Sequence, residues 1–432
     1  MLTIRGPELS IIVLLVARLR SGAWLSRERV LGYSAVWLAI EIAAFVFCVL
    51  VTHGQISALA YDQATHHPAK PATTDFVSFY AAGALADSGT PALAYDQAAH
   101  HAAEQAATEP GIDYLYFFYP PVFLLICAAL AHLPYLAAFV AFESLTLLLF
   151  LAVARSTLRD QDWKLFVPIL AFPSVLWTIG FGQNSFLTAA LFGGALLLID
   201  RRPIASGILF GCLCYKPHFG LLVPIALAAS GRWRAFAAAA ASASLMVGLS
   251  ILFFGWTTWK SFLAIAIGSH VTYESGQVVF AAFVSAFGAV RLLGGSSALA
   301  YFIQAGVTLV AAVAVALVWR RGSSLPVRAA VLASATLVAI PLALYYDLVL
   351  GAVAAMWLVV AARQSGYFAW EKTGLLALFL VPLLPRQIGA ATHVPVGAIG
   401  ALALFGLALV QARRELAQHA TTPGLAAFVE AA

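Results

Sequence analysis

Charged side chains are scarce in this chain: lysine, arginine, aspartate and glutamate make up 10% of its 432 residues, whereas 62% are hydrophobic. A soluble domain carries about 25% charged and about 45–50% apolar residues, so a water-soluble core cannot bury this much apolar surface. The apolar runs are continuous rather than alternating, which excludes a transmembrane β-barrel. We therefore expect an all-α, multi-pass integral membrane protein.

Cysteine is also rare, and its four residues all lie in apolar segments, at Cys48, Cys127, Cys212 and Cys214. We interpret them as small core residues rather than as metal ligands. The net charge of +5 comes from arginine clusters between apolar runs. That pattern is typical of cytoplasmic membrane loops and not of a nucleic-acid-binding surface. Membrane lipid is therefore an expected partner, and nucleic acid is not.

The orientation of the chain follows from its basic residues. Four arginines between residues 18 and 29 precede the first clear span, at about 31–52, and place the N-terminus in the cytoplasm. The apolar run within residues 1–20 is short and lacks a small-residue cleavage site, so we expect an interfacial helix rather than a signal peptide. Residues 53–118 then form a large first external loop with amphipathic helices, and seven of the 19 acidic residues lie there.

Crossings counted between basic loops number about twelve, with both termini cytoplasmic. Only one crossing fits between residue 118 and the basic segment 155–164, so residues 119–133 are expected to form a short hairpin arm. Arginines flank residues 204–229 on both sides, which predicts two half-helices that meet at YKPH (215–218).

These spans predict a single transmembrane domain over residues 1–412. It includes a second external segment at 256–295, and a cytoplasmic tail follows at 413–432. The topology also gathers polar residues from distant loops at the external face, where ionisable groups at the edge of the bilayer indicate a cavity that opens outward. The candidate site residues are Asp75, Tyr80, Tyr119, Gln183, Asn184, Lys216, His218, His270, Tyr346, Asp347 and Arg386.

Lys216 is the most informative cation because it lies at the predicted helix break, beside Pro217, which has no backbone N–H. A lysine at such a break suits a phosphate or another anion. The alternative is that its side chain snorkels to the interface. Polar-cap or turn roles are equally open for Gln183, Asn184 and the Tyr346–Asp347 pair, and His270 can be a lone surface histidine.

Asp75 stands in the stretch TTDFVSFYAAG (73–83), where Phe76, Phe79 and Tyr80 share one helical flank. We expect these aromatic rings at the lipid interface, with Asp75 at the first helical turn above the membrane. A catalytic carboxylate is one interpretation. The other is a solvated loop acid, with the threonines before it capping the helix.

A local repeat pairs ALAYDQATHH (58–67) with ALAYDQAAHH (92–101), which differ at one position. Adjacent histidines on a helix cannot readily bind one metal ion, and no cysteine or carboxylate spacing supports such a site. We interpret the repeat as two similar surface helices.

Four motifs, in this order, resemble glycosyltransferase family 87 of the GT-C superfamily, whose members depend on polyprenyl-phosphate mannose. They are DFVSFYAAGALADSGTPALAYD (75–96), FYPPVFLLICAALAHLP (118–134), GFGQNSFLTAALF (180–192) and ASGILFGCLCYKPHFGLLVP (205–224). The similarity extends over about residues 30–412, and its C-terminal third is mainly one of hydropathy.

The resemblance implies that a sugar, most often mannose, passes from a polyprenyl-phosphate donor to a hydroxyl of a glycolipid or glycan acceptor. The reaction is inverting, with Asp75 at the position of the general base and Lys216 suited to the leaving phosphate. It implies a bacterial inner-membrane protein with its active site on the periplasmic face. No nucleotide or metal cofactor is expected, although several relatives in the superfamily use a divalent cation.

Three other functions fit parts of the pattern. A lipid or polysaccharide transporter or flippase also has many spans and broken helices, but it usually shows related halves and charges near the midplane. A polysaccharide–lipid ligase has a related architecture. A non-catalytic scaffold also fits the many spans, but it does not need a polar cavity on one face, so the polar residues at the external face disfavour it.

Overall fold

The computed structural model describes residues 7–51, 74–159 and 162–421. Within these ranges the chain forms helices and loops without any strand, apart from an isolated β-bridge between Phe283 and Leu344, so the expected all-α class is confirmed. The α-helices are α1 (Pro7–Ser21), α2 (Arg27–Val51), α3 (Phe76–Asp87), α4 (Gln97–Ala107), α5 (Pro121–Ala131), α6 (Tyr135–Leu158), α7 (Phe166–Leu170), α8 (Pro173–Phe181), α9 (Ser185–Leu198), α10 (Pro203–Cys212), α11 (Val223–Ala229), α12 (Trp233–Gly268), α13 (His270–Glu274), α14 (Ala286–Leu292), α15 (Ser297–Arg320), α16 (Leu325–Ala339), α17 (Val349–Ser365), α18 (Glu371–Leu380), α19 (Pro385–Thr392) and α20 (Val396–Thr421).

Short 3₁₀ turns join several of these helices. They are η3 (Pro91–Tyr95), η4 (Trp163–Leu165), η5 (Leu213–Tyr215), η6 (Pro217–Gly220), η7 (Phe280–Ala282), η8 (Tyr345–Leu348) and η9 (Val381–Leu383). Lys216 lies between η5 and η6, so the helical path of 203–229 breaks there, beside Pro217.

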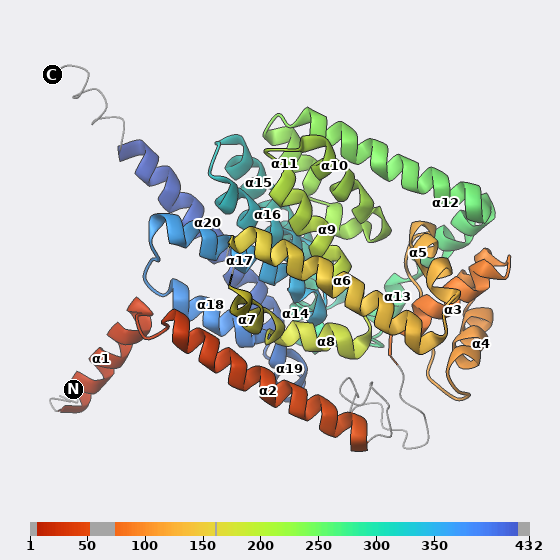
Figure 1. Cartoon of the computed structure of the whole chain (residues 1–432), viewed down its shortest axis with the longest axis horizontal. Helices are drawn as coiled ribbons and strands as arrows, with labels where there is room; N and C mark the ends of the chain where they lie inside the picture. The colour runs from red at the N-terminus through yellow and green to blue at the C-terminus, as the bar shows by residue number, and fades with distance from the viewer. Residues whose placement is uncertain (1–6, 52–73, 160–161, 422–432) are drawn as a thin grey trace.

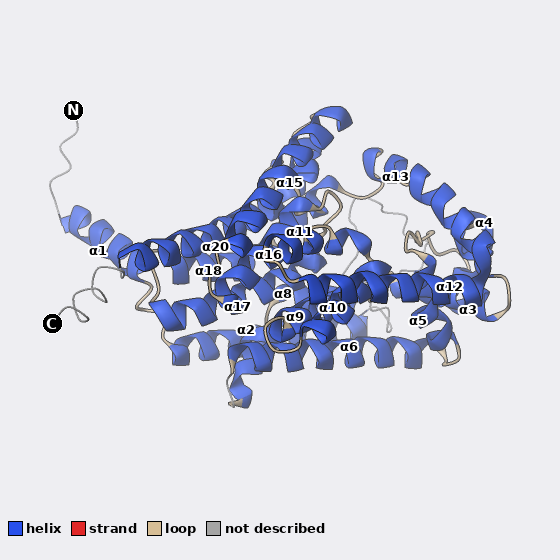
Figure 2. Cartoon of the chain, turned by 90° about the horizontal axis from the view of Figure 1, so that it is seen from above, coloured by secondary structure: helices blue, strands red, loops and turns tan. Residues whose placement is uncertain are grey.

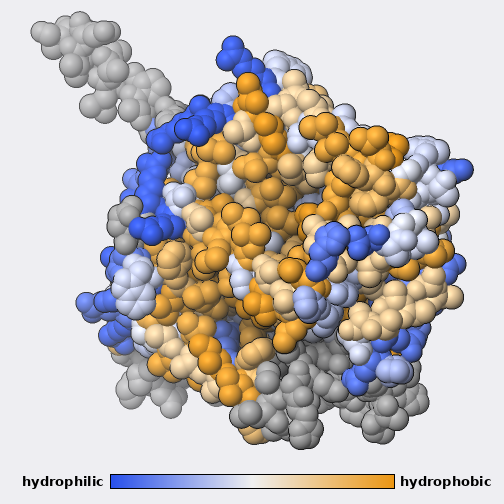
Figure 3. Space-filling model, turned by 45° about the vertical axis from the view of Figure 1, so that its right-hand side comes forward, coloured by the Kyte–Doolittle hydropathy of each residue, from blue (hydrophilic) through white to orange (hydrophobic). Residues whose placement is uncertain are grey.

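Six helical segments within the described residues are long and apolar enough to cross a membrane, or up to eight if each of two bent helix pairs is one span. The bent pairs are 163–181 and 371–392. Exposed apolar side chains on these helices, such as Leu252 at 77% and Phe302 at 75%, suit contact with lipid. Figure 3 shows hydrophobic side chains over much of one face. Several apolar helices thus fit a membrane protein, whereas twelve crossings and the sidedness of the loops stay predictions.

The helices α3, α4 and α5 form one end of the molecule, away from α1 and the end of α20 (Figure 1). The long helices α6 and α12 reach this end from the centre (Figure 2). Helix α12 packs along α10 and then contacts α5 and η3. It turns at Gly255, whose φ of 77° is not helical. At the opposite end, α1 docks on the start of α18, where Trp370 N donates to Arg20 O at 2.7 Å.

The aromatic residues of α3 lie inside the protein, and our prediction that they face lipid was wrong for two of them. Phe76 is 0% and Phe79 2% exposed. Phe76 packs edge-on against Phe139, with ring centroids 5.4 Å apart, and Phe79 packs against Phe123 at 5.1 Å. The reason is that α5 and α6 pack against α3, so its aromatic side chains contact protein rather than lipid.

Gly83 marks the close approach of α3 to α5. A methyl group at this position would run into the carbonyl of Cys127. Gly83→Ala is therefore expected to lower the free energy of unfolding by about 1–3 kcal/mol through overpacking. Thermal unfolding of the purified protein in detergent measures the effect. Gly248→Ala on α12 is the matched control, because nothing lies within 4 Å of its added methyl. Equal unfolding temperatures for the two variants would contradict the close approach.

Candidate active site

Asp75 lies directly before α3, and its side chain makes no capping hydrogen bond to that helix. Its Oδ2 instead accepts a hydrogen bond of 2.6 Å from Gln183 Nε2. Burial raises the pKa of Asp75 to about 6, against the opposing effects of the Gln183 hydrogen bond and the Arg386 charge. At neutral pH the carboxylate is thus largely ionised and a stronger base than an ordinary aspartate, as general-base catalysis requires.

Gly182 explains why Gln183 can reach Asp75. Helix α8 ends at this glycine, which has a φ of 65°. A Cβ here would lie 2.6 Å from Phe76 Cβ, so both the backbone conformation and the contact with α3 require glycine. The turn directs Gln183 and Asn184 into the interior, where they are 5% and 0% exposed.

Lys216 lies on the other side of Asn184. Its Nζ donates to Asp347 Oδ1 at 2.8 Å and to Asn184 Oδ1 at 3.2 Å. The residue is only 5% exposed, so its side chain does not extend to the surface. Asp347 also accepts a hydrogen bond of 3.1 Å from Ser185 Oγ. A buried cation is therefore held beside the amides, with a carboxylate that compensates its charge.

One polar atom between Asp75 and Lys216 is buried without a hydrogen-bond partner, Gln183 Oε1, whereas the Asn184 side chain bonds to the Tyr119 hydroxyl. Buried polar atoms in proteins are almost always hydrogen-bonded, and an unpaired one needs an explanation. Here an unpaired acceptor lies next to an amide that contacts a tyrosine hydroxyl, between a base and a cation. A polar ligand with a hydroxyl group would satisfy the acceptor.

Three further predicted residues belong to this cluster. Tyr119 lies beside Asn184, and burial followed by the charge of Asp347 raises the pKa of the tyrosine well above its usual value. The ring centroid of Tyr346 lies 5.9 Å from Lys216 Nζ. Arg386 is close enough for its charge to act on Asp75. The structure thus brings together Asp75, Tyr119, Gln183, Asn184, Lys216, Tyr346, Asp347 and Arg386.

The remaining three candidates have other surroundings. The Tyr80 hydroxyl donates to Leu133 O at 2.9 Å, away from the amides. His270 is exposed, and its Nδ1 lies 2.7 Å from Ile267 O of the preceding turn. His218 packs against Phe219, with ring centroids 4.9 Å apart, and lies close enough to Lys216 for the charge of the lysine to act on it, so it borders the cluster.

Two residues near the amides were not among the predicted site residues. Ser185 bonds to Asp347, and the Tyr215 hydroxyl lies 2.6 Å from Thr188 Oγ1 and 3.4 Å from Asn184 O. Their only sequence signal is that they adjoin Asn184 and Lys216. In the part of the chain described here, no three His, Cys, Asp or Glu residues come together as a metal-binding group. A hollow of about 440 Å³ beside Arg202 and Arg234 contains none of the site residues.

The family model of glycosyltransferase family 87 matches residues 117–344, more than half of the chain. The chain belongs to glycosyltransferase family 87. No curated protein and no solved structure gave a significant match. The family makes the protein a membrane glycosyltransferase, which uses a sugar donor and an acceptor. The matched region includes Tyr119, Gln183, Asn184 and Lys216 of this family 87 site.

Asp75 and Asp347 lie outside the matched residues. Their connection to the site therefore depends on the geometry: Asp75 bonds to Gln183, and Asp347 bonds to Lys216. Both partners lie within the family match. Asp75 thus precedes the matched region in the chain and Asp347 follows it, and each bonds to one residue within that region.

Proposed function

We propose that this glycosyltransferase moves one sugar, mannose in the first instance, from a polyprenyl-phosphate donor to a hydroxyl of a glycolipid or glycan acceptor. The supporting observation is that a carboxylate and a lysine flank two adjacent buried amides, of which the Gln183 Oε1 is unpaired. A base and a cation on either side of two buried amides suit a displacement, in which one end loses a proton and the other gains negative charge.

In this mechanism Asp75 takes the proton of the acceptor hydroxyl as its oxygen attacks the anomeric carbon. The bond from that carbon to the phosphate oxygen breaks, and the electron pair leaves with the lipid phosphate. Lys216 stabilises the phosphate, whose charge increases in this step. Gln183 Oε1 accepts a hydrogen bond from a sugar hydroxyl. A single attack from the side of Asp75 inverts the anomeric configuration.

The apolar helices of the protein support a lipid-borne donor. Several of them are long enough to cross a membrane, so a donor with a polyprenyl chain would lie in the same membrane as the enzyme. We place the protein in the bacterial inner membrane with both termini cytoplasmic and the site on the periplasmic face. A polysaccharide–lipid ligase remains the alternative, and it would transfer a complete glycan rather than one sugar.

Membranes that contain the chain should transfer label from polyprenyl-phosphate mannose to an endogenous acceptor, and membranes without it should not. Polyprenyl-phosphate glucose and N-acetylglucosamine test the choice of sugar, and the anomeric configuration of the product tests inversion. Transfer from a nucleotide sugar in membranes unable to make polyprenyl-phosphate sugars would contradict the proposal. A product with a whole glycan attached would indicate the ligase.

A further inference from the structure

The first copy of the repeat, at 58–67, lies outside the described residues. The second copy, at 92–101, places its first histidine in the interior beside Glu104, which follows the repeat, rather than on a surface helix. His100 and Glu104 lie one turn apart on α4, and both side chains are 0% exposed. His100 Nδ1 and Glu104 Oε1 face each other at 3.6 Å and have no other partner. Glu104 Oε2 accepts a hydrogen bond of 3.2 Å from Leu115 N. The expectation of a surface helix is therefore wrong for this face of α4, because α4 packs against α3.

The protonation of the pair follows from its hydrogen bonds. His100 Nε2 lies 3.0 Å from the Ser78 carbonyl oxygen, which can only accept, so this nitrogen carries a proton. In a neutral imidazole Nδ1 is then an acceptor, and a protonated Glu104 can donate to it. The alternative is an ion pair, which costs much more to bury without further hydrogen bonds. Burial lowers the pKa of His100 to about 4 and raises the pKa of Glu104 to about 8, so both groups are neutral at pH 7.

Ser78 connects this pair to the base. It lies in the first turn of α3, where its N–H donates to Asp75 O at 3.1 Å. Its hydroxyl donates to Tyr116 O at 3.2 Å. The first turn of α3 is thus fixed from α4 through His100 and from the segment before α5 through Tyr116.

We propose that His100 and the protonated Glu104 form a neutral latch, which holds Ser78 and so keeps the Asp75 carboxylate directed at Gln183. Neither residue touches the reacting atoms, so the role is one of positioning. The inference builds on Asp75 as the base, which belongs to the proposed function. When Glu104 loses its proton, a buried carboxylate oxygen faces the Nδ1 lone pair at 3.6 Å, and the two repel each other instead of forming a complementary donor and acceptor.

The titratable groups around the latch determine the pH at which Glu104 loses its proton. They are Asp75 from the α3 side, Asp96 and His101 of the same helical segment, and Tyr114 and Tyr116 of the following segment. The charge of Asp75 acts on Glu104 and favours its protonated form. Asp75 ionises near pH 6 and Glu104 near pH 8, so a window exists in which the base is charged and the latch is neutral.

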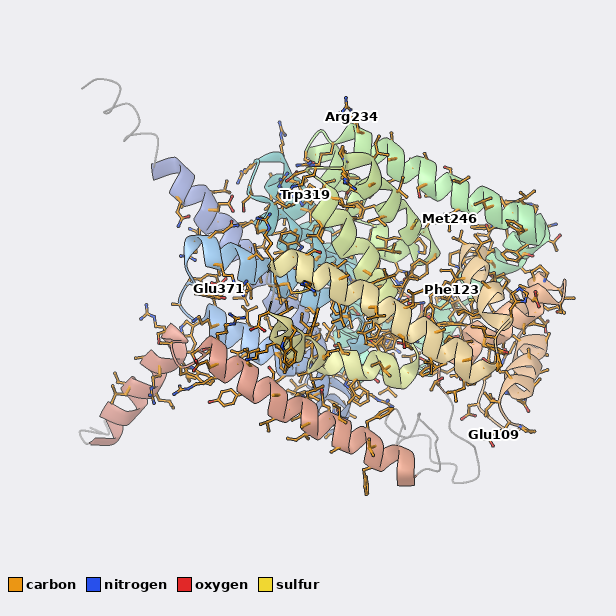
Figure 4. The ribbon with its side chains drawn as sticks, in the orientation of Figure 1. Glu109, Phe123, Arg234, Met246, Trp319 and Glu371 are labelled. Carbon is orange, nitrogen blue, oxygen red and sulfur yellow. The ribbon has the colours of Figure 1, made fainter. Side chains whose placement is uncertain are left out.

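Glu104→Gln tests the latch, because glutamine can donate to Nδ1 and still accept from Leu115 N but cannot ionise. We expect wild-type transfer to rise through about pH 6 and to fall above about pH 8. Glu104→Gln should keep the rise and lose the fall, with activity at pH 7 within about twofold of wild type. Glu109→Gln is the matched control: Glu109 lies exposed beyond α4, at the rim of the structure (Figure 4), and its variant should follow the wild-type profile. The same alkaline fall in Glu104→Gln would overturn the proposal.

Two measurements test the latch without sugar transfer. The unfolded chain ionises Glu104 near pH 4.5, whereas the folded chain keeps this proton until about pH 8, so the residue lowers stability as pH rises between these values. Thermal unfolding should show this slope in wild type and a smaller one in Glu104→Gln. A carboxylic acid C=O band at pH 7 in the infrared spectrum should weaken in that variant. Unchanged spectra and slopes would overturn the latch, whereas absent transfer in wild type would count only against the proposed function.

Discussion

Asp75→Asn is expected to lower sugar transfer by about 10²–10⁴-fold, the usual contribution of a general base. Asparagine has the same shape and can still accept a hydrogen bond from Gln183, so the turn before α3 should remain intact. The acceptor hydroxyl would then have no group to receive its proton. Initial rates with a labelled polyprenyl-phosphate sugar, together with the unfolding temperature in detergent, separate the loss of the base from a loss of folding.

Asp87→Asn is the control for this variant, because Asp87 ends the same helix but is exposed and lies 3.4 Å from His132. It should transfer sugar at the wild-type rate. The pH profile adds a second criterion: with the pKa of Asp75 raised to about 6, the ionised base accumulates as pH rises, so the rate should climb through this value. Asp75→Asn should lack this acidic limb in its residual activity. Activity near wild type in Asp75→Asn would place the base elsewhere.

Composition and local motifs were enough to predict the class of protein and most of the polar residues that lie together around Gln183 and Lys216. The apolar content alone required helices in a membrane. YKPH predicted the break at Lys216, and GQN predicted the polar end of α8, because proline and glycine act on the backbone at their own positions. Lys216 could therefore be selected without knowledge of what it contacts, whereas the choice of Asp75 as the base depended on the resemblance to family 87.

The number of crossings could not be predicted reliably from hydropathy. Helix α16 has 15 residues, and nearly all of them are buried within the protein. A span needs about 20 residues, so this helix is too short to cross a bilayer of ordinary thickness alone. A helix that is apolar on every side can be a span or a core helix, and composition does not distinguish the two.

The contacts between the site residues could not be predicted from the sequence either. Lys216 and Asp347 are 131 residues apart, and only the packing of η8 beside α8 and α17 brings the carboxylate to the lysine. The burial of His100 likewise depends on α3, which covers one face of α4. Both are consequences of tertiary packing, for which a single sequence carries no periodic signal.

Lys216→Met is expected to reduce transfer by about 10²–10³-fold, because the leaving phosphate loses the cation that stabilises its charge. The variant should also lose about 3–5 kcal/mol of stability, since it leaves Asp347 buried without its partner. Methionine keeps most of the apolar length of the side chain, so the change removes mainly the charge, together with its contact of 4.8 Å with the Phe219 ring. Transfer rates at several donor and acceptor concentrations should show that use of the donor suffers more than use of the acceptor.

The double variant Lys216→Met with Asp347→Asn separates the two roles of the lysine. Asparagine removes the uncompensated carboxylate. Its Oδ1 can accept from Leu344 N while its Nδ2 donates to the Ser185 hydroxyl, so most of the lost stability should return, and the protein should fold even if the single variant does not. Transfer should stay at the level of Lys216→Met, because the cation is still missing. Wild-type transfer in the double variant would mean that Lys216 only neutralises Asp347. The leaving phosphate would then need another cation, for which Arg386 is a candidate because its charge acts on Asp75.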